Sequence, residues 1–333
     1  MKPLLSAQYL RALASIGVVA FHTGRATILG QAGVDVFFVI SGFIMWMVTI
    51  KPISPGQFLW HRVVRVVPLY WIATLIMAAL RGASPPDALQ SLLFLPYRDG
   101  AGHVWPVLVQ GWTLNFEMFF YLLFAAVLVI PRRFQLLSLT FVLGALSAIG
   151  IALRPHGAAL HTYTNPLFME FLAGVWLSEI VRLGKFPGFK TAVAMLVAGL
   201  LGFLISLRNP APDLWRFVVW GVPSLLVVSG AISIELRRGM PTIETLKLLG
   251  DGSYSIYLFH PFVFFAVFYV AKSPLGQLSA PIPVAAVTVT IIGTAVGIAA
   301  YFLVERPLTA LLKRWTRRGF VTPATDRVSV SRR

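Results

Sequence analysis

The chain has 333 residues, of which 57% are hydrophobic and only 12% charged, whereas a soluble domain usually carries about 25% charged residues. This composition excludes an ordinary soluble protein, and the absence of Cys excludes disulfides, thiolate nucleophiles and Cys-ligated zinc. The formal net charge of +16 is spread over short loops and a tail, which indicates basic cytoplasmic loops of a membrane protein and excludes a nucleic-acid-binding surface.

An all-α, polytopic membrane fold with about ten transmembrane helices is predicted. A spanning helix needs about 20 mostly apolar residues, and an apolar piece at 88–97 is too short, so we expect it to be re-entrant or interfacial. Residues 1–312 are expected to form one membrane-embedded domain, and 313–333 a basic, disordered cytoplasmic tail. The predicted spans are 8–26, 32–50, 64–80, 109–130, 134–153, 165–182, 189–207, 214–234, 253–271 and 283–304.

The distribution of basic residues predicts the orientation of these spans. Most of the 28 Lys and Arg residues lie at the N-terminus, in the even-numbered loops and in the C-terminal tail. Because basic loops stay on the cytoplasmic side, both termini are predicted to be cytoplasmic.

The first predicted span carries two ionisable residues on one face. Arg11 and His22 are 11 residues apart, which brings them to nearly the same side of a helix, about 16 Å apart along its axis. A charged side chain in hydrocarbon costs roughly 2.5–3.5 kcal/mol, so this stripe needs a reason. A functional pair is one interpretation, and snorkelling of both side chains to the two interfaces is the other.

Two acidic residues are expected at the depth of His22. The second and fourth spans run inward, which places Asp35 and Glu117 in their outer halves. A carboxylate beside an imidazole fixes its tautomer and raises its basicity. The structural alternatives are that Asp35 caps its helix and that Glu117 forms a hydrogen bond between helices. Glu117 lies on a polar stripe with Gln110, Thr113 and Tyr121.

A second polar group is expected in the cytoplasmic half of the bundle. The ninth span places Tyr257 and His260 on one face, next to Pro261, whose freed carbonyls need protein or a wet cavity beside them. Arg62 and Arg65 lie at the same end, although ordinary positive-inside charge explains them equally well. Structural or supporting roles are predicted for Ser41, Tyr121, Glu170 and Glu305.

These positions predict two polar poles in one bundle. The outer pole, acidic and containing His22, suits a general base for a sugar hydroxyl. The inner pole, rich in arginine, suits the phosphates of a donor such as coenzyme A. No metal site is predicted.

Six sequence blocks carry a family resemblance. They are Arg11-x10-His22; Gly33-Val-Asp35-Val-Phe-Phe-Val-Ile-Ser41-Gly42-Phe43; Phe58-x3-Arg62-x2-Arg65-x2-Pro68-x-Tyr70-Trp71; Trp112-Thr-Leu-x2-Glu117-x3-Tyr121; Ser253-Tyr254-x2-Tyr257-Leu-x-His260-Pro261; and Val304-Glu305-Arg306-Pro307. Each block alone is weak, but the six in this order are specific. Over about residues 5–312 the chain resembles the acyltransferase-3 family of bacterial membrane acyltransferases, within it the exopolysaccharide-production (ExoZ-like) branch. The fourth block has Thr where the family has Ser.

The resemblance implies an enzyme of the bacterial inner membrane that moves an acyl group, often acetyl, from cytoplasmic acyl-CoA to a carbohydrate hydroxyl. Acyl-CoA would be a co-substrate, with no permanently bound cofactor. The implied partners are a carbohydrate or lipid-linked glycan acceptor, the lipid bilayer and a polysaccharide biosynthesis machinery. The family's functional Arg and His correspond to Arg11 and His22.

The resulting hypothesis is that His22, oriented by Asp35 or Glu117, deprotonates the acceptor hydroxyl as it attacks the thioester. A covalent acyl-His intermediate is an open variant. Donor binding is assigned to Arg11, Arg62, Arg65, Tyr257 and His260. Embedded ionisable residues also fit a transporter or flippase for a glycolipid or acyl donor, and a sensor or assembly subunit of a polysaccharide machine is a third interpretation.

Overall fold

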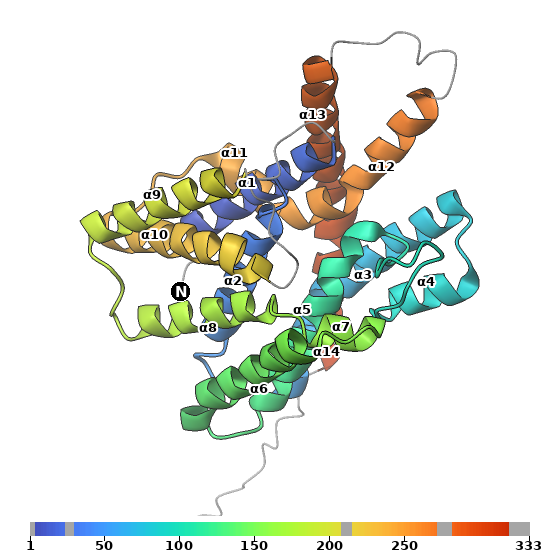
Figure 1. Ribbon diagram of the computed structural model, residues 1–333. Helices are drawn as coiled ribbons and strands as arrows, with labels where there is room; N and C mark the ends of the chain where they lie inside the picture. Colours follow the sequence, from blue (N-terminus) through green and yellow to red (C-terminus); the bar gives the residue numbers. More distant parts are fainter. Residues whose placement is uncertain (1–3, 24–29, 208–214, 272–281, 320–333) are drawn as a thin grey trace, which may run out of the picture.

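The computed structural model describes residues 4–23, 30–207, 215–271 and 282–319, and the secondary structure in these ranges is helical (Figure 1). The elements in chain order are α1 (Leu5–His22), α2 (Gly33–Val48), α3 (Pro55–Arg81), α4 (Pro85–Leu92), the 3-10 turn η2 (Val109–Gly111), α5 (Trp112–Val127), α6 (Arg132–Leu153), α7 (Ala158–Tyr163), α8 (Phe168–Arg182), α9 (Phe189–Ser206), the π-helical η4 (Phe217–Gly221), α10 (Val222–Arg238), α11 (Glu244–Asp251), α12 (Ser253–Ala271), α13 (Ile282–Ala300), the π-helical η6 (Tyr301–Glu305) and α14 (Arg306–Gly319).

The all-α prediction is confirmed, and each of the ten predicted spans overlaps a helix. Within the described ranges, five continuous helical stretches are long and apolar enough to cross a membrane. A sixth results if α11 and α12, bent by 72° relative to each other, form one span. The five are α3, α6, α9, η4 with α10, and α13 through α14. Ten spans and cytoplasmic termini stay predictions.

The helix α3 shows how the sequence sets the ends of an element. Ser54 and Gln57 form a capping box, in which each side chain accepts from the other residue's backbone N–H at 3.2 and 3.4 Å. Pro55 occupies the first helical turn, where its missing N–H costs nothing. Gly82 ends the helix with a φ of 62°, a left-handed conformation that favours glycine.

Close helix packing in the bundle depends on glycine. α2 packs along α8, α9 packs along α10, and α12 packs along α13. At the first contact, a Cβ on Gly42 would clash with the carbonyl oxygen of Phe171, and a Cβ on Gly174 with that of Val39. The two backbones therefore approach more closely than side chains would allow.

α1 lies among several other helices and is anchored at its start. It packs against α2, α10, α11, α12 and α13 (Figure 1). The carboxylate of Glu235, on α10, accepts hydrogen bonds from the backbone N–H groups of Leu5 and Ser6, both at 2.8 Å, and from the Ser6 hydroxyl at 2.6 Å. These are the unpaired donors that every helix start must satisfy, and a carboxylate suits the positive end of the helix dipole.

Two segments outside the predicted spans contain helices. The short apolar piece expected at 88–97 is helical only within α4, and the chain turns at Phe94, which has a positive φ of 57°. Its apolar side chains Leu89 and Leu93 are exposed, and Trp71 on α3 donates to the Leu92 carbonyl at 2.8 Å. α14 continues to Gly319, beyond the expected domain end at 312, and residues 320–333 of the predicted tail lie outside the described residues.

Candidate active site

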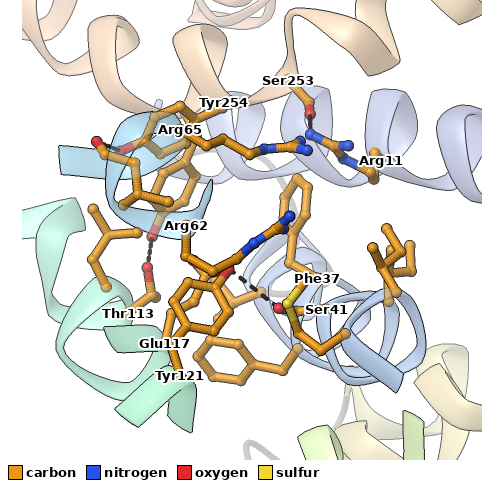
Figure 2. A pocket seen from close by; sticks show the side chains of 18 residues that line it. Arg11, Phe37, Ser41, Arg62, Arg65, Thr113, Glu117, Tyr121, Ser253 and Tyr254 are labelled. Atoms are coloured by element: carbon orange, nitrogen blue, oxygen red, sulfur yellow. Dashed lines mark hydrogen bonds between the residues drawn. The ribbon is translucent and has the colours of Figure 1, made fainter. Parts of the chain in front are cut away.

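A hollow of about 810 Å³, partly open to solvent, lies between α1, α2, α3, α5 and the start of α12 (Figure 2). Its polar wall combines three guanidinium groups with a single carboxylate, and its other wall is apolar, with Phe37, Phe38 and Ile40 of α2. Seven of the predicted site residues line it: Arg11, Ser41, Arg62, Arg65, Glu117, Tyr121 and Tyr257. We call it the arginine pocket.

The three arginines reach the pocket from two helices. Arg62 and Arg65 lie on neighbouring turns of α3, and Arg11 comes from α1 (Figure 2). Arg11 donates to the Ser253 hydroxyl at the start of α12, at 2.9 Å. The Arg62 guanidinium lies 6.0 Å from the ring centre of Phe58. Since guanidinium groups donate in a fixed fork, this arrangement suits a phosphate-bearing anion.

Glu117 is the carboxylate of the arginine pocket. It accepts a hydrogen bond from the Tyr121 hydroxyl, one turn later on α5, and another from Ser41 on α2 at 3.2 Å. The prediction that Glu117 lies with His22 in an acidic outer pole is therefore wrong. Helical spacing placed Glu117 and Tyr121 on one face correctly, but the face is turned toward the arginines.

His22 is the last residue of α1, three turns beyond Arg11, and does not line the arginine pocket. Its Nδ1 lies 2.8 Å from the carbonyl oxygen of Val18, one turn earlier. Because a carbonyl only accepts, Nδ1 carries the proton and Nε2 of the neutral ring carries a lone pair. The side-chain amide nitrogen of Gln110 lies 3.3 Å from that Nε2 and is its donor. The orientation of His22 is therefore set by a backbone carbonyl, not by a carboxylate.

His260 belongs to the corner of His22 and not to the arginine pocket. The two imidazole rings have centroids 5.0 Å apart and planes inclined by 52°. His260 is fully buried and does not line the arginine pocket. Its predicted place in a basic inner pole is wrong, because its ring lies beside that of His22 on α1.

Tyr257 lies between the arginine pocket and the residues around His22. It lines the arginine pocket, and its hydroxyl donates to the backbone carbonyl of Gln110 at 2.9 Å and lies 3.0 Å from the Thr113 hydroxyl. Gln110 in turn contacts His22. Tyr257 and Gln110 therefore form a chain of contacts from the arginine pocket to the imidazole of His22.

Asp35 does not orient His22. Its two carboxylate oxygens accept from Arg216 at 3.1 and 2.8 Å, and its side chain is fully buried. Residue spacing along the chain did not predict the direction in which the Asp35 side chain points. The expected Asp35–His22 contact is wrong for this reason.

Glu170 and Glu305 lie outside the arginine pocket. Glu170, 1% exposed, is beside Asp35, and Gly221 approaches its carboxyl group so closely that a Cβ there would come within 2.9 Å. Glu305 accepts from the Ser255 hydroxyl at 2.6 Å, and its charge acts on Arg65 and Arg11. Ser255 therefore holds the Glu305 carboxylate, whose charge acts on the two arginines from outside the arginine pocket.

Arg216 is the buried charge that the sequence interpretation missed. Its guanidinium lies between two indoles, 5.6 Å from the ring centre of Trp112 and 4.7 Å from that of Trp220. A lone arginine at the start of the predicted span 214–234 was the available signal, because an embedded cation needs a partner. Among the described residues, no group of three or more His, Cys, Asp or Glu is placed to hold a metal ion.

The family model of the acyltransferase domain matches residues 4–304. This match covers nearly the whole chain. The chain belongs to the acyltransferase-3 family.

Characterised relatives agree with this assignment. The chain is 41% identical over 302 residues to the exopolysaccharide production protein ExoZ of Rhizobium meliloti, covering 87% of this chain and 92% of that protein. It is 29% identical to the putative membrane-bound transacylase BcsY of Komagataeibacter xylinus, over 89% of this chain and 81% of that protein. It is 26% identical to the peptidoglycan O-acetyltransferase OatA of Listeria monocytogenes, over 75% of this chain but only 48% of that protein. No solved structure matches.

The chain is therefore a multi-pass membrane enzyme that transfers acyl groups. Two groups of polar side chains lie along α1, the arginine pocket at Arg11 and the imidazoles at His22.

Proposed function

We propose that the protein is an O-acyltransferase, most simply an O-acetyltransferase, that moves the acyl group of cytoplasmic acyl-CoA to a hydroxyl of an exopolysaccharide or another envelope glycan at the inner membrane. The observation that carries the proposal is the placement of Arg11 and His22 on α1, with Arg62 and Arg65 lining one pocket with the first and an imidazole nitrogen that only the Gln110 amide contacts, at 3.3 Å, at the second. The similarity to the exopolysaccharide production protein ExoZ supports the glycan acceptor, and the similarity to the peptidoglycan O-acetyltransferase OatA supports the acetyl group.

The arginine pocket would hold the phosphates of the donor. Arg11, Arg62 and Arg65 provide three fixed cations against one carboxylate, and Arg forks bind phosphate oxygens in pairs. Glu117, held by Ser41 and Tyr121, keeps the cluster from carrying three uncompensated charges. The aromatic side of the hollow, with Phe37 and Phe38, offers an apolar wall for the rest of the donor.

The imidazole corner, which consists of His22 with its neighbours Gln110 and His260, would carry out the transfer. About 16 Å of helix separates Arg11 from His22, so the extended arm of the donor runs along α1 with its thioester near His22. The acceptor hydroxyl takes the place of the Gln110 amide at Nε2, where the present contact is long at 3.3 Å. Nε2 accepts the hydroxyl proton, the oxygen forms a bond to the thioester carbonyl carbon, the C–S bond breaks, and the proton passes to the departing thiolate.

The variant His22→Ala tests the proposed role of His22 as general base. We expect the O-acetyl content of surface polysaccharide, measured by NMR in cells that lack the native enzyme, to fall by about 100-fold or more, since a general base contributes about 10²–10⁴. Membrane levels and acetyl-CoA binding by the purified protein stay normal, because the arginine pocket is untouched. Normal acetylation by His22→Ala would refute the proposal.

The matched variant is Arg62→Gln with Arg65→Gln, which leaves the imidazole corner intact. It should weaken acetyl-CoA binding by about tenfold or more, the loss expected for charge-assisted contacts.

A liposome assay distinguishes the enzyme from a transporter. In liposomes with labelled acetyl-CoA, the enzyme should leave label on added carbohydrate. Movement of label across the membrane without such a product would indicate a transporter instead.

A further inference from the structure

The imidazole of His260 has a buried nitrogen with no hydrogen-bond partner among the described residues. The residue is 0% exposed, and its Nδ1 lies 3.0 Å from the carbonyl oxygen of Ile256, one turn earlier on α12. Its Nε2 has no donor or acceptor in reach. Leaving a buried polar atom unpaired is unfavourable because it loses its hydrogen bonds to water, so such an atom calls for an explanation.

His22 and His260 have the same tautomer for the same reason. Each Nδ1 donates to the carbonyl four residues earlier on its own helix, that of Val18 or Ile256. Each neutral ring therefore carries its lone pair on Nε2. The ring centroids lie 5.0 Å apart, so the two imidazoles are neighbours, and two neutral rings of this tautomer cannot form a hydrogen bond through their Nε2 atoms without an added proton.

Protonation of His22 changes which hydrogen bonds its ring can form. Protonated His22 donates from both nitrogens, and Nδ1 already has its acceptor in Val18. The amide nitrogen of Gln110 is itself a donor and no longer fits Nε2. The unpaired Nε2 of His260 is the acceptor that the protonated ring lacks.

Among the described residues, no carboxylate is placed to accept a hydrogen bond from Nε2 of protonated His22. On α2, Asp35 is bound to Arg216, and on α5, Glu117 is bound to Ser41 and Tyr121. The other groups that face the two rings are apolar or uncharged: Phe21 on α1, Phe264 and Tyr257 on α12, and the backbone of Gly293 on α13.

The remaining charges near α1 lie toward its N-terminal end, away from His22. Glu235 of α10 caps the first turn, and Asp251 of α11 acts on Arg11. No charge on these helices contacts either imidazole in the described part of the chain.

We propose that His22 and His260 act as a proton-sharing pair in which Nε2 of His260 accepts a hydrogen bond from protonated His22 during acyl transfer. This inference rests on the proposed function. The acceptor hydroxyl gives its proton to Nε2 of His22, and the pair holds that proton between its two Nε2 atoms while the new C–O bond forms and the C–S bond breaks. The same proton then passes to the thiolate, so the pair returns to its starting state.

The test uses ¹⁵N-histidine NMR of the full-length protein in lipid nanodiscs. In the native protein, the Nε2 signals of both His22 and His260 should move at one common pH midpoint, while both Nδ1 signals stay protonated. His260→Phe, which keeps the ring volume but has no acceptor, should lower the His22 midpoint by about one pH unit, as expected for a lost hydrogen bond to a charged group. His260→Gln, whose amide oxygen can accept, should keep the midpoint near the native value.

Transfer from acetyl-CoA should fall by about tenfold or more in His260→Phe, and less in His260→Gln, while the KM for acetyl-CoA stays unchanged. His103→Phe is the control, because His103 lies in an exposed turn and stacks on Trp105; both readouts should match the native protein.

A His260 signal that does not move through the His22 midpoint would overturn the proposal, and this measurement needs no variant. An unchanged His22 midpoint in a monodisperse His260→Phe protein would overturn it as well. These results leave the proposed function standing as long as His22→Ala abolishes transfer, whereas an active His22→Ala would defeat both.

Discussion

The buried ion pair between Asp35 and Arg216 gives Asp35 a structural role at the residue scale. Asp35 lies in the first turn of α2, and the pair also involves the Gln31 carbonyl, which Arg216 reaches at 3.2 Å. Indoles cover the guanidinium from two sides. A fully desolvated pair of this kind holds α2 to the start of η4 and depends on both partners being charged.

Asp35→Asn should therefore destabilise the protein. Removing one partner of a buried pair costs about 3–5 kcal/mol, because the other charge stays buried without its counter-ion. We expect a lower melting temperature in detergent and less protein in the membrane. Asp99→Asn, in an exposed turn, is the matched control and should leave both unchanged.

A different outcome would instead assign Asp35 a direct role in acyl transfer. If Asp35→Asn melts at the native temperature but no longer transfers acyl groups, its carboxylate acts on the substrate and not on the fold. The double variant Asp35→Asn with Arg216→Met separates the two cases further, because removing both charges should recover part of the lost stability.

At the residue scale, the sequence predicted which side chains are buried inside the bundle better than where they point. Arg11, Arg62 and Arg65 were predicted to share a site, and they line one hollow. His22 was assigned to an acidic pole, yet its described neighbours are Gln110 and His260. Helical spacing fixes depth along an axis, whereas the rotation of each helix about its axis depends on packing against all its neighbours, which no local pattern reports.

At the scale of elements, the contact between α2 and α8 depends on two residues without side chains. Gly42 and Gly174 let each helix approach the other's backbone. Phe38 of α2 stacks on Phe171 of α8 beside this contact, with ring centroids 4.5 Å apart. The same contact carries Asp35 and Glu170 on the first turns of the two helices.

Gly42→Ala should separate the two helices. The added methyl group would clash with the Phe171 carbonyl, and overpacking costs about 1–3 kcal/mol, occasionally more. Thermal melting of the purified protein should show the loss. Gly144→Ala on α6 is the control, since nothing lies within 4 Å of its Cβ and alanine favours a helix by about 1 kcal/mol. Equal melting temperatures for Gly42→Ala and Gly144→Ala would contradict the close approach.

Apolar segment length predicted the helices well, since each predicted span overlaps one. It did not predict their interruptions. η4 and η6 are π-helical turns inside longer helices, and α11 meets α12 at 72°. Such breaks arise where side chains from other helices must be accommodated, so they depend on tertiary contacts that hydropathy does not contain.

At the scale of the whole molecule, the orientation in the membrane follows from the predicted cytoplasmic termini. The chain contains no Cys, so single cysteines can report the side on which a loop lies. Ala101→Cys should react with a membrane-impermeant maleimide in intact cells, because its loop is predicted to lie outside. Lys51→Cys should react only after permeabilisation. Both positions are exposed, and the reverse pattern of labelling would invert the topology.

The anchoring of α1 has a consequence for the choice of acyl carrier. Glu235 caps the first turn of the helix, and the backbone rise of α1 sets the axial separation between Arg11 and His22 at about 16 Å. Under the proposed function, a carrier whose reactive sulfur lies much nearer to its charged end, or much farther from it, would not reach both residues, whatever acyl group it bears.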